Sequence, residues 1–125
     1  MSDLYDLLAR ERERSRSSDA VRADLKILID THRLDQSESA ACVSLFESMI
    51  DEKLEGPHRN VFLGPRETET KRVAQTLGSV ASMHRVAYVL HTLAGRNKYV
   101  DGRYFMHGDL RELDMAWDGV LGWRS

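Results

Sequence analysis

Five side chains between residues 82 and 92 carry groups that can form hydrogen bonds to a partner. They are Ser82, His84, Arg85, Tyr88 and Thr92. Hydroxyl, imidazole and guanidinium groups on the outer face of a helix can reach base edges when that helix enters the major groove of DNA. We therefore expect this segment to contact double-stranded DNA.

Basic residues flank this segment and could neutralise phosphates, which would make DNA affinity fall steeply with salt. Residues 1–55 hold 13 acids and 8 bases, residues 56–107 hold 3 acids and 8 bases, and residues 108–125 hold 4 acids and 2 bases. Only the middle of the chain is therefore basic. The cations that we expect to contact phosphates are Lys71, Arg72, Arg96, Lys98 and Arg103, the last of them beside a predicted hairpin tip.

The middle of the chain must position these groups, and its pattern predicts five elements in order. Apolar residues at helical spacing predict a helix over residues 37–54, and a short apolar run predicts a strand over residues 61–63. Two further helices are predicted over residues 68–77 and 82–94. An Asp-Gly pair between aromatic and β-branched residues then predicts an antiparallel hairpin over residues 98–106.

This order resembles the winged helix-turn-helix domains of bacterial transcription regulators, over residues 60–106. The resemblance implies that residues 82–94 form the recognition helix and that the hairpin forms the wing. At the sequence level, it rests on Val73-Ala74 and Leu77-Gly78 at the turn, on His84-Arg85 with Leu90, Leu93 and Gly95 in the second helix, and on Asp101-Gly102-Arg103-Tyr104 at the wing tip.

A second interpretation of the same stretch is one unbroken helix over residues 67–95 in an all-α bundle. Gly78, Ser79, Ala81 and Ser82 would then be small residues that permit close packing. Glycine inside a helix costs only about 1 kcal/mol relative to alanine, which tertiary contacts can offset. The sequence thus predicts a mainly α fold, with a winged-helix-like hairpin or without one.

The two ends of the chain are also predicted to be helical. Leu4, Leu7 and Leu8 begin an amphipathic helix, and a second helical run, capped by Ser18 or Asp19, could be separate from it or continuous with it. Asp35 or Ser37 is predicted to start the helix over residues 37–54. A last helix is predicted to begin at Asp109 and to run through Leu121.

The chain of 125 residues, with 42% hydrophobic and 30% charged residues, fits a single domain. We divide it into an acidic helical part over residues 1–55 that could form a homodimer, a basic helix-turn-helix and hairpin over residues 56–107, and a C-terminal helix over residues 108–125. A single cysteine, Cys42, and the absence of a long apolar run favour a cytoplasmic protein with no membrane contact. We expect Cys42 to be a buried hydrophobe and not a nucleophile.

Other chemistry has weaker support. His84, Tyr88 and His91 share one helix face, but no zinc-type ligand spacing is present, so we expect no metal and no cofactor. The run from His91 to Gly95 resembles the core of histidine phosphotransfer domains, except that Ala94 stands where that family has lysine. No nucleophile elbow or phosphate-binding loop is present, so we expect no enzyme.

The sequence therefore predicts a small DNA-binding transcription regulator. The alternative is a helical protein-interaction module without catalytic activity, whose basic segment docks on an acidic protein surface. Such a module could be an adaptor, an immunity protein, or a phage-type or anti-CRISPR-like inhibitor of a nucleic-acid machine.

Overall fold

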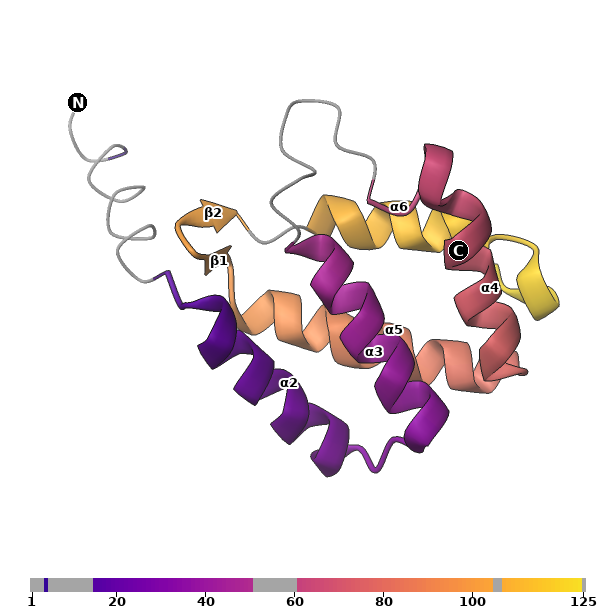
Figure 1. The fold of residues 1–125 in the computed structure, drawn as a ribbon, viewed down its shortest axis with the longest axis horizontal. Coiled ribbons are helices and arrows are strands. Elements are labelled where there is room, and N and C mark those ends of the chain that lie inside the picture. The colour runs from indigo at the N-terminus through magenta and orange to yellow at the C-terminus, as the bar shows by residue number, and fades with distance from the viewer. Residues whose placement is uncertain (1–3, 5–14, 51–60, 105–106, 125) are drawn as a thin grey trace.

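The computed structural model describes residue 4 and residues 15–50, 61–104 and 107–124, with the backbone alone at residues 103, 104, 107 and 108. Within these residues the chain is mainly helical, as the sequence predicts (Figure 1). The elements are α2 (Ser18–Thr31), α3 (Gln36–Met49), α4 (Glu67–Leu77), α5 (Val80–Arg96) and α6 (His107–Trp117), the short 3-10 helices η2 (Gly64–Arg66) and η3 (Val120–Gly122), and the strands β1 (Tyr99–Val100) and β2 (Arg103–Tyr104).

Helix α5 is the centre of the fold, because it packs against α2, α3, α4 and α6. In Figure 1, α3 crosses in front of α5, while α4 stands at one end of it and the hairpin at the other. Seven of its side chains are buried, and they recur at spacings of three and four residues. The buried set is Met83, Val86, Ala87, Val89, Leu90, Leu93 and Ala94.

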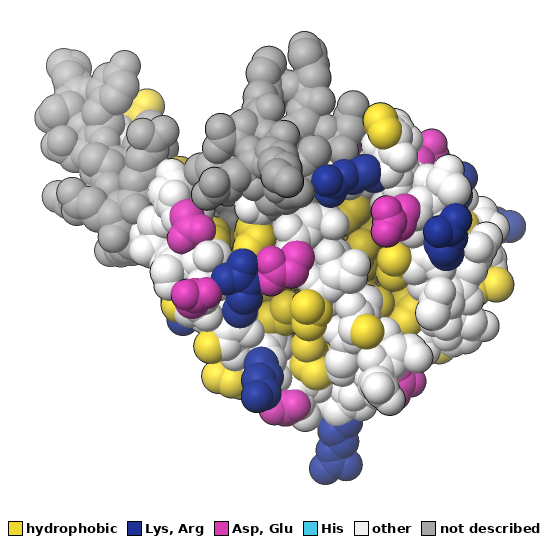
Figure 2. Space-filling model, viewed as in Figure 1, with side chains coloured by type: hydrophobic (Ala, Val, Ile, Leu, Met, Phe, Trp, Pro, Cys, Tyr) yellow, Lys and Arg dark blue, Asp and Glu magenta, His cyan; other side chains and the backbone are white. Residues whose placement is uncertain are grey.

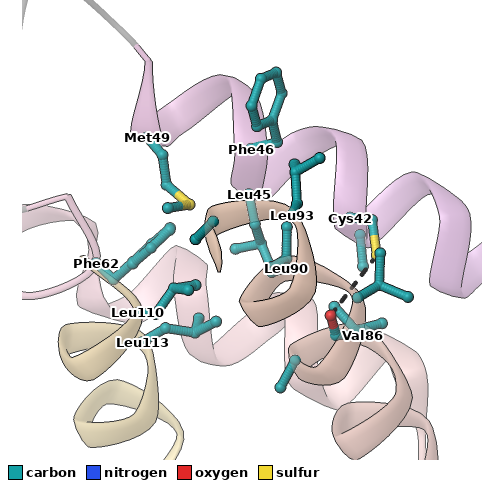
Figure 3. Close-up of a cluster of buried hydrophobic side chains, with 14 of the residues drawn as sticks. Cys42, Leu45, Phe46, Met49, Phe62, Val86, Leu90, Leu93, Leu110 and Leu113 are labelled. Carbon is teal, nitrogen blue, oxygen red and sulfur yellow. Dashed lines mark hydrogen bonds between the residues drawn. The ribbon is translucent and has the colours of Figure 1, made fainter. Parts of the chain in front are cut away.

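The core joins α5 to the apolar faces of its neighbours (Figure 3). Leu45 and Phe46 of α3 meet Leu90 and Leu93 of α5, and all four are at most 3% exposed. Burying a side chain of this size stabilises a fold by roughly 1.5–3 kcal/mol. The remaining outer face of α5 stays at the surface.

The backbone turns sharply between α4 and α5, as the winged-helix interpretation requires. Helix α4 ends at Gly78, whose φ of 81° lies in the left-handed region that glycine adopts without strain. The Ser79 hydroxyl then caps α5 by accepting a hydrogen bond from the Ser82 N–H at 3.2 Å. The interpretation as one unbroken helix is therefore wrong.

Local capping signals set the start of the earlier helices. Asp35 and Glu38 form a reciprocal capping box, so one of the two predicted start residues of α3 is confirmed. The side-chain cap of α2 is Ser17, one residue before the predicted Ser18. The predicted N-terminal helix, apart from the helical Leu4, and the last residues of the predicted helix over 37–54 lie outside the described residues.

The predicted hairpin forms, but its strands are only two residues long. Tyr99 pairs with Tyr104 and Val100 with Arg103, and the turn residues Asp101 and Gly102 have φ of 52° and 79°. Positive φ at both positions is the geometry that an Asp-Gly turn favours.

This hairpin does not project as a wing. The Arg16 backbone pairs with β1 in parallel, Ser18 N–H donates to the Asp101 carboxylate at 2.9 Å, and Gly102 N–H donates to the Ser15 hydroxyl at 2.6 Å. Because residues 15–18 occupy the edge and the tip, the structure supports a mainly helical fold and does not support a winged hairpin. We call the contacts of residues 15–18 with residues 97–102 the hairpin clasp.

The predicted strand over residues 61–63 and the predicted ends of the C-terminal helix are also wrong. Val61 and Phe62 do not form a strand, because no neighbouring strand among the described residues pairs with them; each is 1% exposed and anchors a bend in the core. The C-terminal helix begins at His107, so Asp109 lies in its first turn and not at its cap. This helix ends at Trp117 instead of continuing through Leu121, because the backbone turns at Gly119 with a φ of 82°.

Candidate functional site

The side chains predicted to read bases divide into two groups on α5. His84, Arg85 and Tyr88 are exposed on its outer face. Ser82 and Thr92 are half-buried, and the Thr92 hydroxyl donates to the Tyr88 carbonyl at 2.8 Å within the helix. Three of the five side chains are therefore brought together at the surface.

The predicted phosphate contacts are not gathered around that face. Two precede α5 and two follow it, and a 17-residue helix is about 25 Å long. Lys71 lies 3.7 Å from Glu67, and Arg96 lies 3.9 Å from Asp24. Arg72 and Lys98 are exposed, and the side chain of Arg103 is not described. On the face drawn in Figure 2, Lys and Arg side chains lie singly, interspersed with acidic and hydrophobic ones.

Arg85 joins α5 to the end of α2 and the turn that follows it. Its Nε donates to both carboxylate oxygens of Glu38, at 3.2 and 3.1 Å, and its Nη2 donates to the carbonyls of His32 and Arg33, each at 3.0 Å. Carbonyls at the end of a helix lack partners within that helix, so Arg85 satisfies acceptors that the backbone leaves open. The Glu38 side chain is only 4% exposed, whereas that of Arg85 is 47% exposed.

Glu38 balances the charge of Arg85. Burial by itself would raise the pKa of this carboxyl, but hydrogen bonds from the Asp35 backbone, the Ser82 hydroxyl and Arg85 outweigh burial and hold the pKa below its ordinary value of 4.5. Glu38 is therefore ionised at neutral pH, and most of the Arg85 guanidinium serves the fold.

Cys42 is buried beside this cluster, as the sequence predicts. Burial, and then the charge of Glu38, raise the pKa of its thiol to about 12. The thiol lies 3.9 Å from the Val86 carbonyl, to which it donates (Figure 3). A thiol in this environment stays protonated at neutral pH and is inert as a nucleophile.

An open cleft of about 660 Å³ lies along the outer face of α5. We call it the α5 cleft. One wall is formed by the end of α2 with the turn after it, and the other by α6 with the C-terminal residues. Every histidine whose side chain the structure describes lines it. The lining residues are His32, Leu34, His84, Arg85, Ala87, Tyr88, His91, Asp114, Trp123 and Arg124.

Aromatic contacts fix the walls of the α5 cleft. The Trp123 ring lies 4.5 Å from the His84 ring and 5.3 Å from the Trp117 ring, measured between centroids. Its indole Nε1 donates to the Asp114 carboxylate at 2.8 Å. Across the cleft, the rings of His32 and Tyr88 meet edge to face at 5.2 Å.

The residues that form the walls of the cleft were not among the predicted site residues. Trp123 returns to α5 because Gly119 and Gly122 have φ of 82° and 89°, conformations that reverse the chain after α6. Two glycines three residues apart, just before a tryptophan, are the signal that could have indicated this turn. No comparable local signal marks His32 and Leu34, which reach the cleft through the packing of α2 on α5.

The described residues give no support to metal chemistry or to membrane insertion. Among them, no group of three or more His, Cys, Asp or Glu side chains could hold a metal ion. None of the described helices has the length and apolar character needed to cross a bilayer. The predicted homodimer through the acidic helices stays a prediction.

Comparison of the chain with protein-family models, with curated proteins and with solved structures finds no match.

Proposed function

We propose that this protein is a non-catalytic module that binds a protein partner, and that the α5 cleft is its binding surface. The observation that carries this proposal is Tyr88, whose side chain is 60% exposed in a cleft bounded by Trp123 and two arginines. Tyrosine, tryptophan and arginine are the residue types that most often supply the binding energy of protein interfaces.

The walls of the cleft are already held in place without a partner. Trp123 is fixed by Asp114 and Trp117, and Arg85 is fixed by its contacts with Glu38 and the end of α2. Ordering a long side chain on binding costs about 0.5–1.5 kcal/mol, so a surface fixed in advance loses less affinity. This arrangement favours a recognition surface over a chance depression.

The shape of the cleft favours a segment of a protein over a small molecule. Small-molecule sites enclose most of the surface of their ligand. The α5 cleft is open to solvent, and its most exposed large hydrophobic side chain, Tyr88, lies on its floor helix. A protruding loop or helix of a partner could contact that side chain without being enclosed.

DNA binding through the same helix is the competing function, and the geometry favours it less. Arg85 uses Nε and Nη2 within the fold, and the turn at Asp101 and Gly102 is occupied by the hairpin clasp. Lys71 lies on α4 and Lys98 follows the last residue of α5. A positively charged surface that follows the DNA backbone needs these groups side by side.

The test places the photo-crosslinking amino acid p-benzoylphenylalanine at position 88 of the full chain. The matched control places it at Ile27, which is 59% exposed and does not line the cleft. Both proteins are irradiated in an extract of the cells that encode them. We expect a discrete protein adduct from position 88 alone, competed by excess unmodified protein but not by the Tyr88→Ala variant.

Two other results are informative. A nuclease-sensitive adduct from position 88 would favour the DNA-binding regulator instead. Adducts of equal yield from positions 27 and 88, or none from position 88, would contradict the cleft as a protein-binding surface.

A further inference from the structure

We infer that the segment bound in the α5 cleft is acidic, and that it presents carboxylates to Arg124 and Arg85 while an apolar side chain lies on Tyr88 and Trp123. This inference rests on the proposed function and names the chemistry of the partner. It follows from the charges, the hydrogen-bonding groups and the apolar surface of the cleft.

The cleft contains one arginine that forms no ion pair with a described carboxylate. Arg85 is balanced by Glu38 behind it, and Asp114, the one acidic lining residue, already accepts a hydrogen bond from Trp123. Arg124 is exposed and forms no ion pair with any described residue. Arg124 can therefore form an ion pair with a carboxylate of a ligand.

The hydrogen-bonding groups of the cleft are mainly donors. Nη1 of Arg85 takes no part in the contacts with Glu38, His32 and Arg33, so two N–H groups of a rigidly held guanidinium remain for a ligand. The guanidinium of Arg124 and the hydroxyl of Tyr88 add further donors. Carboxylates, which only accept, are the side chains that complement such a set.

The three histidines strengthen the same preference. His32, His84 and His91 line the cleft, and an imidazole carries either no charge or a positive charge. Each imidazole can donate an N–H hydrogen bond to a carboxylate. No lining residue other than Asp114 opposes an anionic ligand.

The apolar part of the lining defines the rest of the ligand. The apolar lining residues are Leu34, Ala87, Tyr88 and Trp123, of which Tyr88 is 60% exposed and Ala87 and Trp123 are 8% and 5% exposed. An aromatic or aliphatic side chain flanked by acids would bury apolar area there while its neighbours reach the arginines. A basic segment would be repelled by the arginines, and a purely polar segment would leave the apolar lining uncovered.

The test uses the two tryptophan indole resonances in the ¹H–¹⁵N spectrum of the full chain. The indole N–H of Trp123 lies at the cleft, whereas that of Trp117 is buried and donates to the Thr70 carbonyl at 3.0 Å, so it is an internal control. The probes are three acetylated hexapeptides with a central phenylalanine flanked by glutamate, glutamine or lysine. We expect the glutamate peptide to shift the Trp123 resonance and leave the Trp117 resonance in place.

We expect the glutamine peptide to bind about fivefold more weakly than the glutamate peptide, as the loss of a few exposed ion pairs predicts, and the lysine peptide to bind least. Arg124→Gln should lower the affinity for the glutamate peptide part of the way to that for the glutamine peptide, because Arg85 still contacts a carboxylate. The control is Arg111→Gln, which removes an exposed arginine of α6 that does not line the cleft and should change nothing.

Each outcome has a defined meaning. Equal binding of the three peptides, or an equal effect of the Arg111 and Arg124 variants, overturns the inference and leaves the proposed function intact. Failure of all three peptides to shift the Trp123 resonance also overturns it. The crosslinking test at position 88 decides separately whether the cleft binds a protein. If duplex DNA shifts the Trp123 resonance and none of the peptides does, the ligand of the cleft is DNA and not an acidic segment.

Discussion

The hairpin clasp and the α5 cleft both hold polar groups, but they use them differently. In the clasp, the Asn97 side chain is 2% exposed; it accepts a hydrogen bond from Arg16 and donates to Asp24 and to the Leu93 carbonyl. In the cleft, Tyr88 and Arg124 are exposed. A polar group satisfied inside the fold stabilises it, whereas an exposed group on a fixed wall remains free for recognition.

Arg85 both satisfies polar groups of the fold and lines the cleft. Its removal should therefore have the largest effect on the free energy of unfolding. Arg85→Met leaves the buried Glu38 carboxylate without its cation and should lower the free energy of unfolding by about 3 kcal/mol. Urea denaturation followed by circular dichroism measures the change. Arg111→Met, the control for an exposed arginine, should cost less than about 0.5 kcal/mol. Equal stability of the two variants would contradict the role of Arg85 in the fold.

Removing the centre of the clasp should destabilise the fold without changing the cleft. Asn97→Ala deletes three hydrogen bonds of a buried amide and should cost about 2 kcal/mol. The Trp123 indole resonance of the folded variant should stay at its original position. A displaced Trp123 resonance would show that the clasp and the cleft are coupled, against the separation proposed above.

Glu38 should make the free energy of unfolding fall as the pH is lowered. Its pKa is lower in the folded chain than its ordinary value of 4.5, so the unfolded state binds a proton first as the pH falls. The stabilisation is complete above that value and is lost as the pH falls through the folded pKa. Glu38→Gln should therefore cost about 1.5 kcal/mol at pH 7 and progressively less below pH 4.5. If the difference in the free energy of unfolding between the original chain and Glu38→Gln stays constant with pH, Glu38 is not an ionised carboxylate in the folded chain.

Two glycine substitutions should shift stability in opposite directions. Gly78→Ala places a side chain at a φ of 81° and should cost about 1 kcal/mol, although its Cβ would meet no atom within 4 Å. Gly95→Ala, inside α5 with equally open space, should stabilise the helix by about 0.5 kcal/mol. Thermal denaturation of both variants measures the pair. The same sign for both would contradict the left-handed turn between α4 and α5.

The smallest effect on stability is expected at the centre of the cleft. Tyr88→Ala removes a side chain that is 60% exposed and should change the free energy of unfolding by less than about 0.5 kcal/mol. The same variant should lose the binding of the glutamate peptide. A large loss of stability would place Tyr88 with the structural residues and weaken its assignment to recognition.

Much of the helical fold could be predicted from the sequence, because short-range interactions decide it. The turn at Gly78, the capping box of Asp35 and Glu38, and the Asp101-Gly102 turn each depend on residues at most four positions apart. The strand predicted over residues 61–63 does not form, because a strand depends on interactions with a distant segment. A strand needs a partner, and no neighbouring strand in the described part of the chain reaches Val61 or Phe62.

The candidate site was predicted in part, and only along one helix. The sequence by itself determined that His84, Arg85 and Tyr88 share a face of α5, because helical spacing fixes that relation. Only the tertiary structure decided that Arg85 turns to Glu38, 47 positions away, and that Arg16 meets Asn97 across 81 positions. It also decided that Trp123 closes the cleft. The physical reason is that helix and turn geometry repeat with a local period, whereas the partner of a long polar side chain depends on which distant segments the packed core brings beside it.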